Sequence, residues 1–151
     1  MRIKGFTLIE LLVVISIIGI LASLVLASYS GAQKQTRDTQ RKSDLSQYRN
    51  ALESYAAVND GKYPARNGVK ADLILCNNEL APFLSNCPKD PIASGDYNYY
   101  YYSGESGGGA SATKYVLWVQ LETGGYWEIC SDGRAGKFDG RGKADANCDL
   151  P

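Results

Sequence analysis

The sequence predicts an α+β fold in which one long N-terminal helix, with a membrane half and an amphipathic half, packs on a small antiparallel sheet. An apolar run containing a single carboxylate begins at Phe6, and helical spacing of apolar residues continues to about Val58. Short runs rich in tyrosine, valine and tryptophan, separated by glycine, then follow. With 151 residues, the chain has room for one small domain and an anchor.

The first half of the helix is long enough to cross a membrane. Residues 11–33 carry no charge, and about 20 apolar residues span the hydrocarbon core of a bilayer. Arg2 and Lys4 precede the run, and positive charge on a short flanking segment stays on the cytoplasmic side. We therefore expect the N-terminus in the cytoplasm and the rest of the chain outside the membrane.

Glu10 is the unusual residue of this apolar run. A charge at the centre of a bilayer costs about 3 kcal/mol, so it is rarely kept without a partner or a function. No cation lies within the run, so we expect the partner of Glu10 outside its own helix. The alternative is a chance acidic residue that the helix dipole favours near a helix start.

A secretory signal peptide is the competing interpretation of the N-terminus, with cleavage near Ala27 and Ser28. The segment before the apolar run is very short, an acidic residue lies within the run, and the helical pattern continues through Ala27. These three features favour an anchor that is retained. Because no cysteine follows until Cys76, a lipoprotein is also disfavoured.

The second half of the helix is amphipathic. One apolar stripe at three- and four-residue steps comprises Leu45, Tyr48, Ala51, Leu52 and Tyr55. Most of the remaining positions are polar or charged, so this half is expected to lie against a globular partner. Residues 59–64 supply the stop signal. A helix from Phe6 to Val58 is about 80 Å long at the usual rise per residue.

The remaining residues predict a small sheet after an irregular stretch. Residues 65–94 contain three prolines and are expected to be irregular. Strands are expected at 97–102, 115–121 and 126–130, the last two joined by a hairpin loop, in a sheet of three or four strands. The glycine- and serine-rich run at 103–113 is expected to be a flexible surface loop, and it lacks the lysine of a phosphate loop.

Four cysteines in a small exported domain predict two disulfides. Three connectivities are possible. We favour Cys76 with Cys87 and Cys130 with Cys148, because each pair closes a short loop. Zinc is the alternative, but the chain contains neither a Cys-x-x-Cys pair nor histidine.

The segment Lys4–Glu10 closely resembles the prepilin processing motif of type IV pilins and type II secretion pseudopilins. The resemblance covers about residues 1–64. It implies that a prepilin peptidase cuts between Gly5 and Phe6 and that the new Phe6 amine is methylated. It also implies that Glu10 of an incoming subunit pairs with the Phe6 amine of a neighbour, which sets the axial register.

The resemblance further implies a pilin-like organisation with four segments. These are a leader peptide (1–5), a transmembrane and filament-core helix (6–27), the amphipathic half of the helix (28–58) and a globular pilin head (59–151). The segment Gly61–Pro64, directly after the helix, resembles the pattern of major pseudopilins of type II secretion.

The implied function is that of a structural subunit that polymerises into a type IV pilus-like or type II secretion pseudopilus filament. Its implied partners are identical subunits, the prepilin peptidase, an inner-membrane assembly platform and, before assembly, the lipid bilayer. The implied location is the bacterial inner membrane, in a single pass with the head outside, and then an extracellular pilus or a periplasmic pseudopilus. No catalytic constellation is present in the sequence, so we do not expect an enzyme.

The alternative is a minor filament subunit that acts as an adhesin or DNA-uptake receptor, with a tyrosine cluster and the basic C-terminal loop as its binding site. The cluster comprises Tyr97, Tyr99, Tyr100, Tyr101 and Tyr102. Tyrosine favours strands and interfaces, so core and subunit contacts are the preferred interpretation. Without Arg2 and Lys4, 14 basic and 16 acidic residues remain, a net charge of −2, which does not favour a nucleic-acid partner.

Calcium is the one cofactor that the resemblance implies, through aspartates in a loop after the last strands. Asp132 and Asp145 match those positions, with Asp139 between them, and oxygen ligands suit calcium. Four cations in the same loop oppose it: Arg134, Lys137, Arg141 and Lys143. We favour the alternative, a solvated loop closed by the Cys130–Cys148 disulfide.

Overall fold

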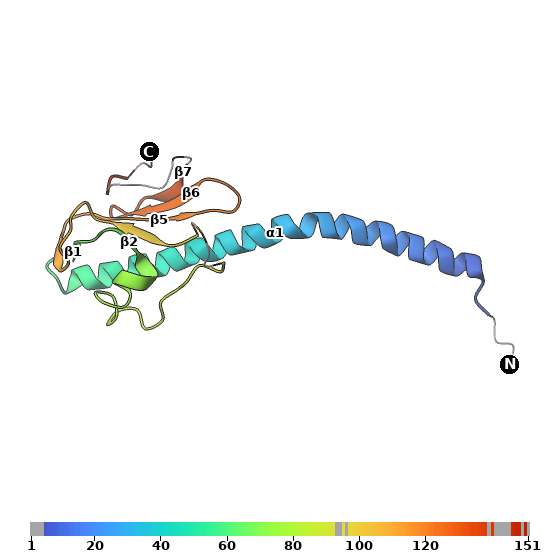
Figure 1. The fold of residues 1–151 in the computed structure, drawn as a ribbon, viewed down its shortest axis with the longest axis horizontal. Coiled ribbons are helices and arrows are strands. Elements are labelled where there is room, and N and C mark those ends of the chain that lie inside the picture. The colour runs from blue at the N-terminus through green and yellow to red at the C-terminus, as the bar shows by residue number, and fades with distance from the viewer. Residues whose placement is uncertain are drawn as a thin grey trace. The chain divides into compact units, whose positions relative to one another are not determined.

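The computed structural model describes residues 5–92, 95, 97–138, 140, 146–148 and 150 (Figure 1). Its contacts divide the chain into two compact units, one up to Thr36 and one from Arg37 onward. The long helix α1 (Leu8–Ala57) runs through both units. The arrangement of a long N-terminal helix and antiparallel sheets is the predicted α+β fold, which is confirmed.

Helix α1 ends at a glycine stop. Asp60 and Gly61 adopt positive φ angles of 52° and 72°, and the Gly61 N–H donates to the Ala56 carbonyl at 2.9 Å. A left-handed residue at this place satisfies a terminal carbonyl and turns the chain away from the helix axis. The predicted end at about Val58 is therefore correct to one residue.

The second unit contains two antiparallel sheets. The five-stranded sheet has the order β2-β3-β5-β6-β7 and the small sheet pairs β1 with β4. The strands are β1 (Tyr63–Pro64), β2 (Asn67–Lys70), β3 (Tyr100–Tyr102), β4 (Ala110–Ala112), β5 (Val116–Gln120), β6 (Tyr126–Cys130) and β7 (Ala135–Phe138). A one-turn π-helix, η1 (Ala71–Leu75), follows β2.

Three expectations about the sheet region need correction. The main sheet has five strands, not three or four, because β2 and β7 contain glycine and lack an alternating pattern yet pair with their neighbours. The stretch 65–94 includes β2 and η1. The run 103–113 includes β4, whose Ala112 is buried opposite Tyr63, so it is not wholly a flexible loop.

The core lies between residues 37–57 of α1 and one face of the five-stranded sheet, as Figure 1 shows. Leu45, Tyr48 and Leu52 of the predicted stripe are completely buried. Leu117 and Ile129, which lie opposite each other in β5 and β6, are part of the same core. The helical stripe and the strand alternation therefore meet as the sequence predicts.

Candidate functional site

The start of α1 holds Glu10 in a capping box with Thr7. The Thr7 N–H and hydroxyl both donate to Glu10 Oε2, at 2.9 and 2.7 Å, and the Glu10 N–H donates to Thr7 Oγ1 at 3.3 Å. This reciprocal pattern satisfies donors that the first helical turn leaves unpaired. These bonds come from a neutral residue just before α1, so our expectation of a charged partner for Glu10 outside its own helix stays a prediction. The Thr-x-x-Glu spacing was the sequence signal for the capping box.

The residues around Glu10 form an exposed apolar surface. Phe6 and Ile9 are exposed, and with Glu10, Val13 and Val14 they line a shallow hollow of about 400 Å³. The helix is apolar enough to cross a membrane, and none of the candidate span is buried. Gly5 and Phe6, the residues at the predicted cut, are also exposed.

In the second unit, a buried ion network joins α1 to two distant loops. The Arg41 side chain is completely buried; it donates to Asp38 and Glu122, each at 2.7 Å, and twice to Asp90, at 2.6 and 3.0 Å. Arg37 makes a second two-point contact to Glu122, at 2.7 and 2.6 Å. Such forked arginine contacts fix direction as well as distance. The sequence analysis did not find this network.

Asp38 extends the network to the β5–β6 loop. Its carboxylate accepts the Glu122 and Thr123 N–H groups at 2.9 and 3.0 Å and the Thr123 hydroxyl at 2.7 Å. These bonds hold the hairpin loop against the helix. Burial raises the pKa of Asp38, but its hydrogen bonds to Glu122, Thr123 and Arg41 outweigh burial, so the net pKa is lowered.

Charge pairing also shifts the pKa values of the buried arginine and of the glutamate in the network. Hydrogen bonds from Arg37, and then from Arg41, lower the pKa of Glu122 to about 2. Burial disfavours the charged form of Arg41, yet its bonds to Asp90, Glu122 and Asp38 leave its pKa raised. The shifts in the pKa values of Asp38, Arg41 and Glu122 all favour their charged forms, so these groups bond as ions that tie the loops to α1.

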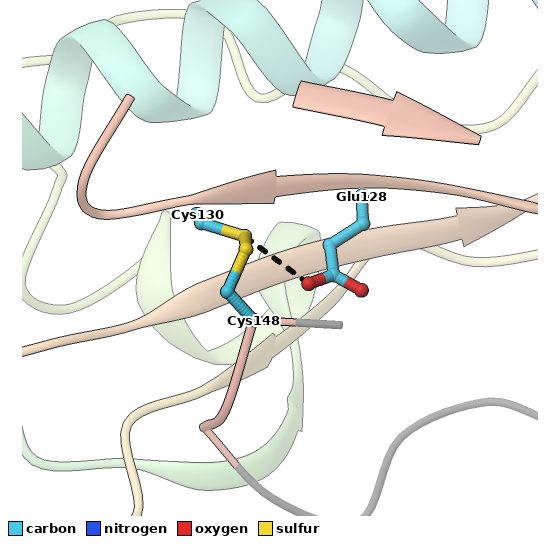
Figure 2. A group of neighbouring side chains, drawn as sticks. All are labelled: Glu128, Cys130 and Cys148. Atoms are coloured by element: carbon cyan, nitrogen blue, oxygen red, sulfur yellow. Dashed lines mark hydrogen bonds between the residues drawn. A yellow bond between two sulfur atoms is a disulfide. The ribbon is translucent and has the colours of Figure 1, made fainter. Parts of the chain in front are cut away.

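Both favoured cysteine pairs are bridged in the structure. Cys76 is joined to Cys87 and Cys130 to Cys148, each with Cα atoms 5.8 Å apart. The second bridge lies beside a buried carboxylate, because Glu128 Oε1 is 3.1 Å from Cys130 Sγ (Figure 2). Glu128, Cys130 and Cys148 have metal-ligand atoms within 4.8 Å of one another. Bridged sulfurs are not thiolates, so this cluster is not a metal site in the oxidised chain.

The carboxylate of Asp132, one of the expected calcium ligands, is bonded to a neighbouring arginine. It accepts the Arg134 N–H at 3.0 Å and the Arg134 Nε–H at 2.9 Å. Asp139 and Asp145, the other expected calcium ligands, lie outside the described residues. Calcium binding by these three aspartates therefore stays a prediction.

The tyrosine cluster is divided between the core and the outer face of the sheet. Tyr99 and Tyr101 are completely buried; the hydroxyl of Tyr99 donates to Asp44 and that of Tyr101 to the Pro64 carbonyl. Tyr100 stacks on Trp118 at 4.4 Å between ring centroids. Tyr99 and Tyr101 thus agree with the core interpretation, whereas Tyr100 belongs to a row of aromatic rings with Trp118, Tyr126 and Phe138.

Comparison with known proteins gives two kinds of similarity. Residues 1–26 match the family described as Prokaryotic N-terminal methylation motif. The type II secretion system core protein G of Aeromonas hydrophila is 43% identical over 100 residues, which cover 60% of this chain and 68% of that relative. The protein of the same description from Escherichia coli (strain K12) is 37% identical over 87 residues, 58% of this chain and 59% of the relative.

Pilus proteins match over a shorter part of the chain. The fimbrial protein of Pseudomonas aeruginosa is 44% identical over 59 residues, which cover 39% of this chain and 37% of that relative. The chain thus spans less than two thirds of the length of the Escherichia coli and Pseudomonas relatives. No solved structure is significantly similar to this chain.

Proposed function

This chain belongs to the family of type IV pilins and type II secretion pseudopilins that includes the type II secretion system core protein G, and from this we propose that it is a structural subunit of a helical filament. The observation that carries the proposal is the exposed apolar first half of α1, with a carboxylate in its first turn. Such a surface requires lipid or other subunits to cover it.

Processing supplies the charge that assembly uses. The prepilin peptidase cuts between Gly5 and Phe6, which leaves a methylated, cationic amine on Phe6. The amine of one subunit pairs with Glu10 of the next and sets the axial register. In a low dielectric, the pair is strong and the loss of either member is costly.

The capping box presents Glu10 for this pairing. Among the described residues, both Thr7 donors end on Oε2, so Oε1 is available to the amine of a neighbouring subunit. The charge is thereby held at the helix start while the subunit is in the membrane. This explains how a carboxylate is tolerated in the apolar segment before assembly.

The apolar first half of α1 also supports a membrane-anchored stage before assembly. The subunit crosses the inner membrane once, with its head outside, and an assembly platform extracts it into the filament. The larger share of the Aeromonas core protein G that is covered, 68% against 37% for the fimbrial protein, favours a secretion pseudopilus over a type IV pilus. An adhesin or receptor role is not favoured, because Tyr99 and Tyr101 are buried.

Substitution of Glu10 tests the proposal. Glu10→Gln and Glu10→Ala subunits, expressed without a wild-type copy, should enter the membrane at the wild-type level or above but yield little or no filament after shearing. Ser23→Ala, in the same apolar helix, is the matched control and should assemble normally. Filaments of normal number and length from Glu10→Ala subunits would show that the charge pair does not register assembly.

The cut is tested separately by intact-mass analysis of the membrane form. The expected mass is that of a chain beginning at Phe6 and carrying one methyl group. A chain that begins at Met1, or near Ser28, would overturn the processing step.

A further inference from the structure

A buried carboxylate contacts one of the two disulfides. Glu128 is completely buried on β6, and its Oε1 lies 3.1 Å from Cys130 Sγ, as the dashed line in Figure 2 shows. Cys130 follows two positions later on the same strand, so both side chains lie on the same face of the sheet. A sulfur in a disulfide carries no hydrogen, so the bridged form offers the carboxylate no donor at this contact.

The other disulfide has a different neighbour. Cys76 Sγ lies 3.9 Å from the carbonyl oxygen of Leu84, which is a neutral acceptor. The two bridges therefore differ in the group next to a sulfur, a carboxyl group in one and a backbone carbonyl in the other. Each bridge can serve as the reference for the other in one experiment.

We propose that Cys130–Cys148 is a thiol-exchangeable bridge that opens before Cys76–Cys87, and that Glu128 is the positioning residue that sets this order. In the open form the Cys130 S–H donates to Glu128 Oε1 across a contact of 3.1 Å, against 3.9 Å between Cys76 Sγ and the Leu84 carbonyl oxygen. A group that favours only the reduced form raises the reduction potential of the bridge. The Leu84 carbonyl gives Cys76 a weaker form of the same bond.

A small pocket gives a thiol access to this bridge. It has a volume of about 250 Å³, and its wall includes Cys130 and Cys148 together with the cations Lys114 and Arg134. The attacking species in exchange is a thiolate anion, which Lys114 attracts, whereas Arg134 is paired with Asp132 of the same wall. Cys148 is half-buried whereas Cys130 is almost completely buried, so Cys148 is the sulfur that is attacked.

Two molecules of glutathione supply the two electrons that reduce the Cys130–Cys148 bridge. A glutathione thiolate bonds to Cys148 Sγ, the bond between the two cysteine sulfurs breaks, and Cys130 leaves as a thiolate. The proton that the first glutathione lost on ionising ends on Cys130, beside Glu128. A second glutathione attacks the mixed disulfide, which releases Cys148 as a thiol and leaves oxidised glutathione.

Opening has a structural consequence at the end of the chain. Leu150 packs over Gly136 of β7, where an added Cβ would lie 3.0 Å from Leu150 Cδ2, and Arg134 donates to the Leu150 carbonyl. The disulfide is the covalent link between this segment and β6. After its reduction, the described contacts of this segment are non-covalent: the packing of Leu150, the Arg134 hydrogen bond and the bond from Lys114 to Asn147.

A redox titration tests the inference. The full processed chain, in detergent, is equilibrated in glutathione and then dithiothreitol buffers of stepped potential, quenched with acid and alkylated, and each bridge is followed by peptide mass. In the wild type, Cys130–Cys148 should open at the higher potential. Glu128→Gln should lower its equilibrium constant for reduction about tenfold, which is about 30 mV for a two-electron couple, without moving Cys76–Cys87.

The controls separate this role from a general loss of stability. Asp60→Asn, a carboxylate change at the end of α1, should move neither bridge. Opening of both bridges at one potential in the wild type, or of Cys76–Cys87 first, overturns the proposal without any variant. A Glu128→Gln change that leaves Cys130–Cys148 unmoved, or moves both bridges equally, overturns the role of Glu128.

Discussion

Arg41 and Asp90 form a two-point ion pair, 49 residues apart in the sequence, in which both side chains are buried. The pair ties to α1 the segment that follows the Cys76–Cys87 bridge. The same guanidinium also contacts Asp38 and Glu122. Four charges therefore share one buried site. Removing Arg41 would take away the cation that contacts all three buried carboxylates, although Glu122 keeps its contacts to Arg37.

Arg41→Met should destabilise the head strongly. Breaking a buried ion pair by removing one member costs about 3–5 kcal/mol, and methionine keeps much of the volume but none of the charge. Urea unfolding followed by tryptophan fluorescence measures the loss. Arg49→Met, a partly exposed arginine of the same helix whose side chain contacts Asn50 at 3.4 Å, should change the free energy of unfolding by no more than about 0.5 kcal/mol. Equal losses in the two variants would contradict the role of the network.

Acid should weaken the head through Glu122. Its pKa is about 2 in the folded chain against an ordinary value of 4.5, so its contribution is fully present above pH 4.5 and is lost as the pH falls toward about 2. The free energy of unfolding, measured by urea titration across this window, should decline with falling pH. Glu122→Gln should flatten that decline, and a slope from Asp38 should remain. An unchanged slope in Glu122→Gln would contradict the pairing.

Gly68→Ala should cost more than Gly61→Ala. Both glycines have positive φ angles, 68° and 72°, but a Cβ at Gly68 would lie 2.9 Å from the Tyr102 hydroxyl oxygen, whereas a Cβ at Gly61 meets nothing within 4 Å. Backbone strain of about 1–2 kcal/mol applies to both, and the contact adds to it only at Gly68. Tyr102→Phe should recover part of the Gly68→Ala loss and none of the Gly61→Ala loss. Thermal unfolding of the three single and two double variants measures both effects.

Calcium should have little effect on the folded head. Arg134 already occupies the Asp132 carboxylate, and a calcium ion would have to displace it. The melting temperature should be the same in excess calcium and in excess chelator, with an Asp132→Asn variant as the matched control. A rise of the melting temperature in calcium that Asp132→Asn abolishes would support the aspartate site instead.

Local patterns in the sequence account for the long helix and for the apolar stripe that it buries. The spacing of Leu45, Tyr48 and Leu52 identified the stripe that is buried, because side chains three and four positions apart share a helix face. Gly61 marked the helix end for a similar reason, since it adopts the left-handed conformation that the stop requires. The Thr7–Glu10 capping box was equally local and was readable from its spacing.

Tertiary structure alone decided what the charged residues of α1 do and which weak strands join the sheet. Arg41 reads as one more polar position on an amphipathic helix, and only the approach of Asp90 and Glu122 turns it into a buried hub. β7, with glycine and lysine among its four residues, becomes a strand because β6 offers it a ladder of hydrogen bonds. Periodicity describes neighbours along the chain, whereas these contacts depend on segments that only the folded chain brings together.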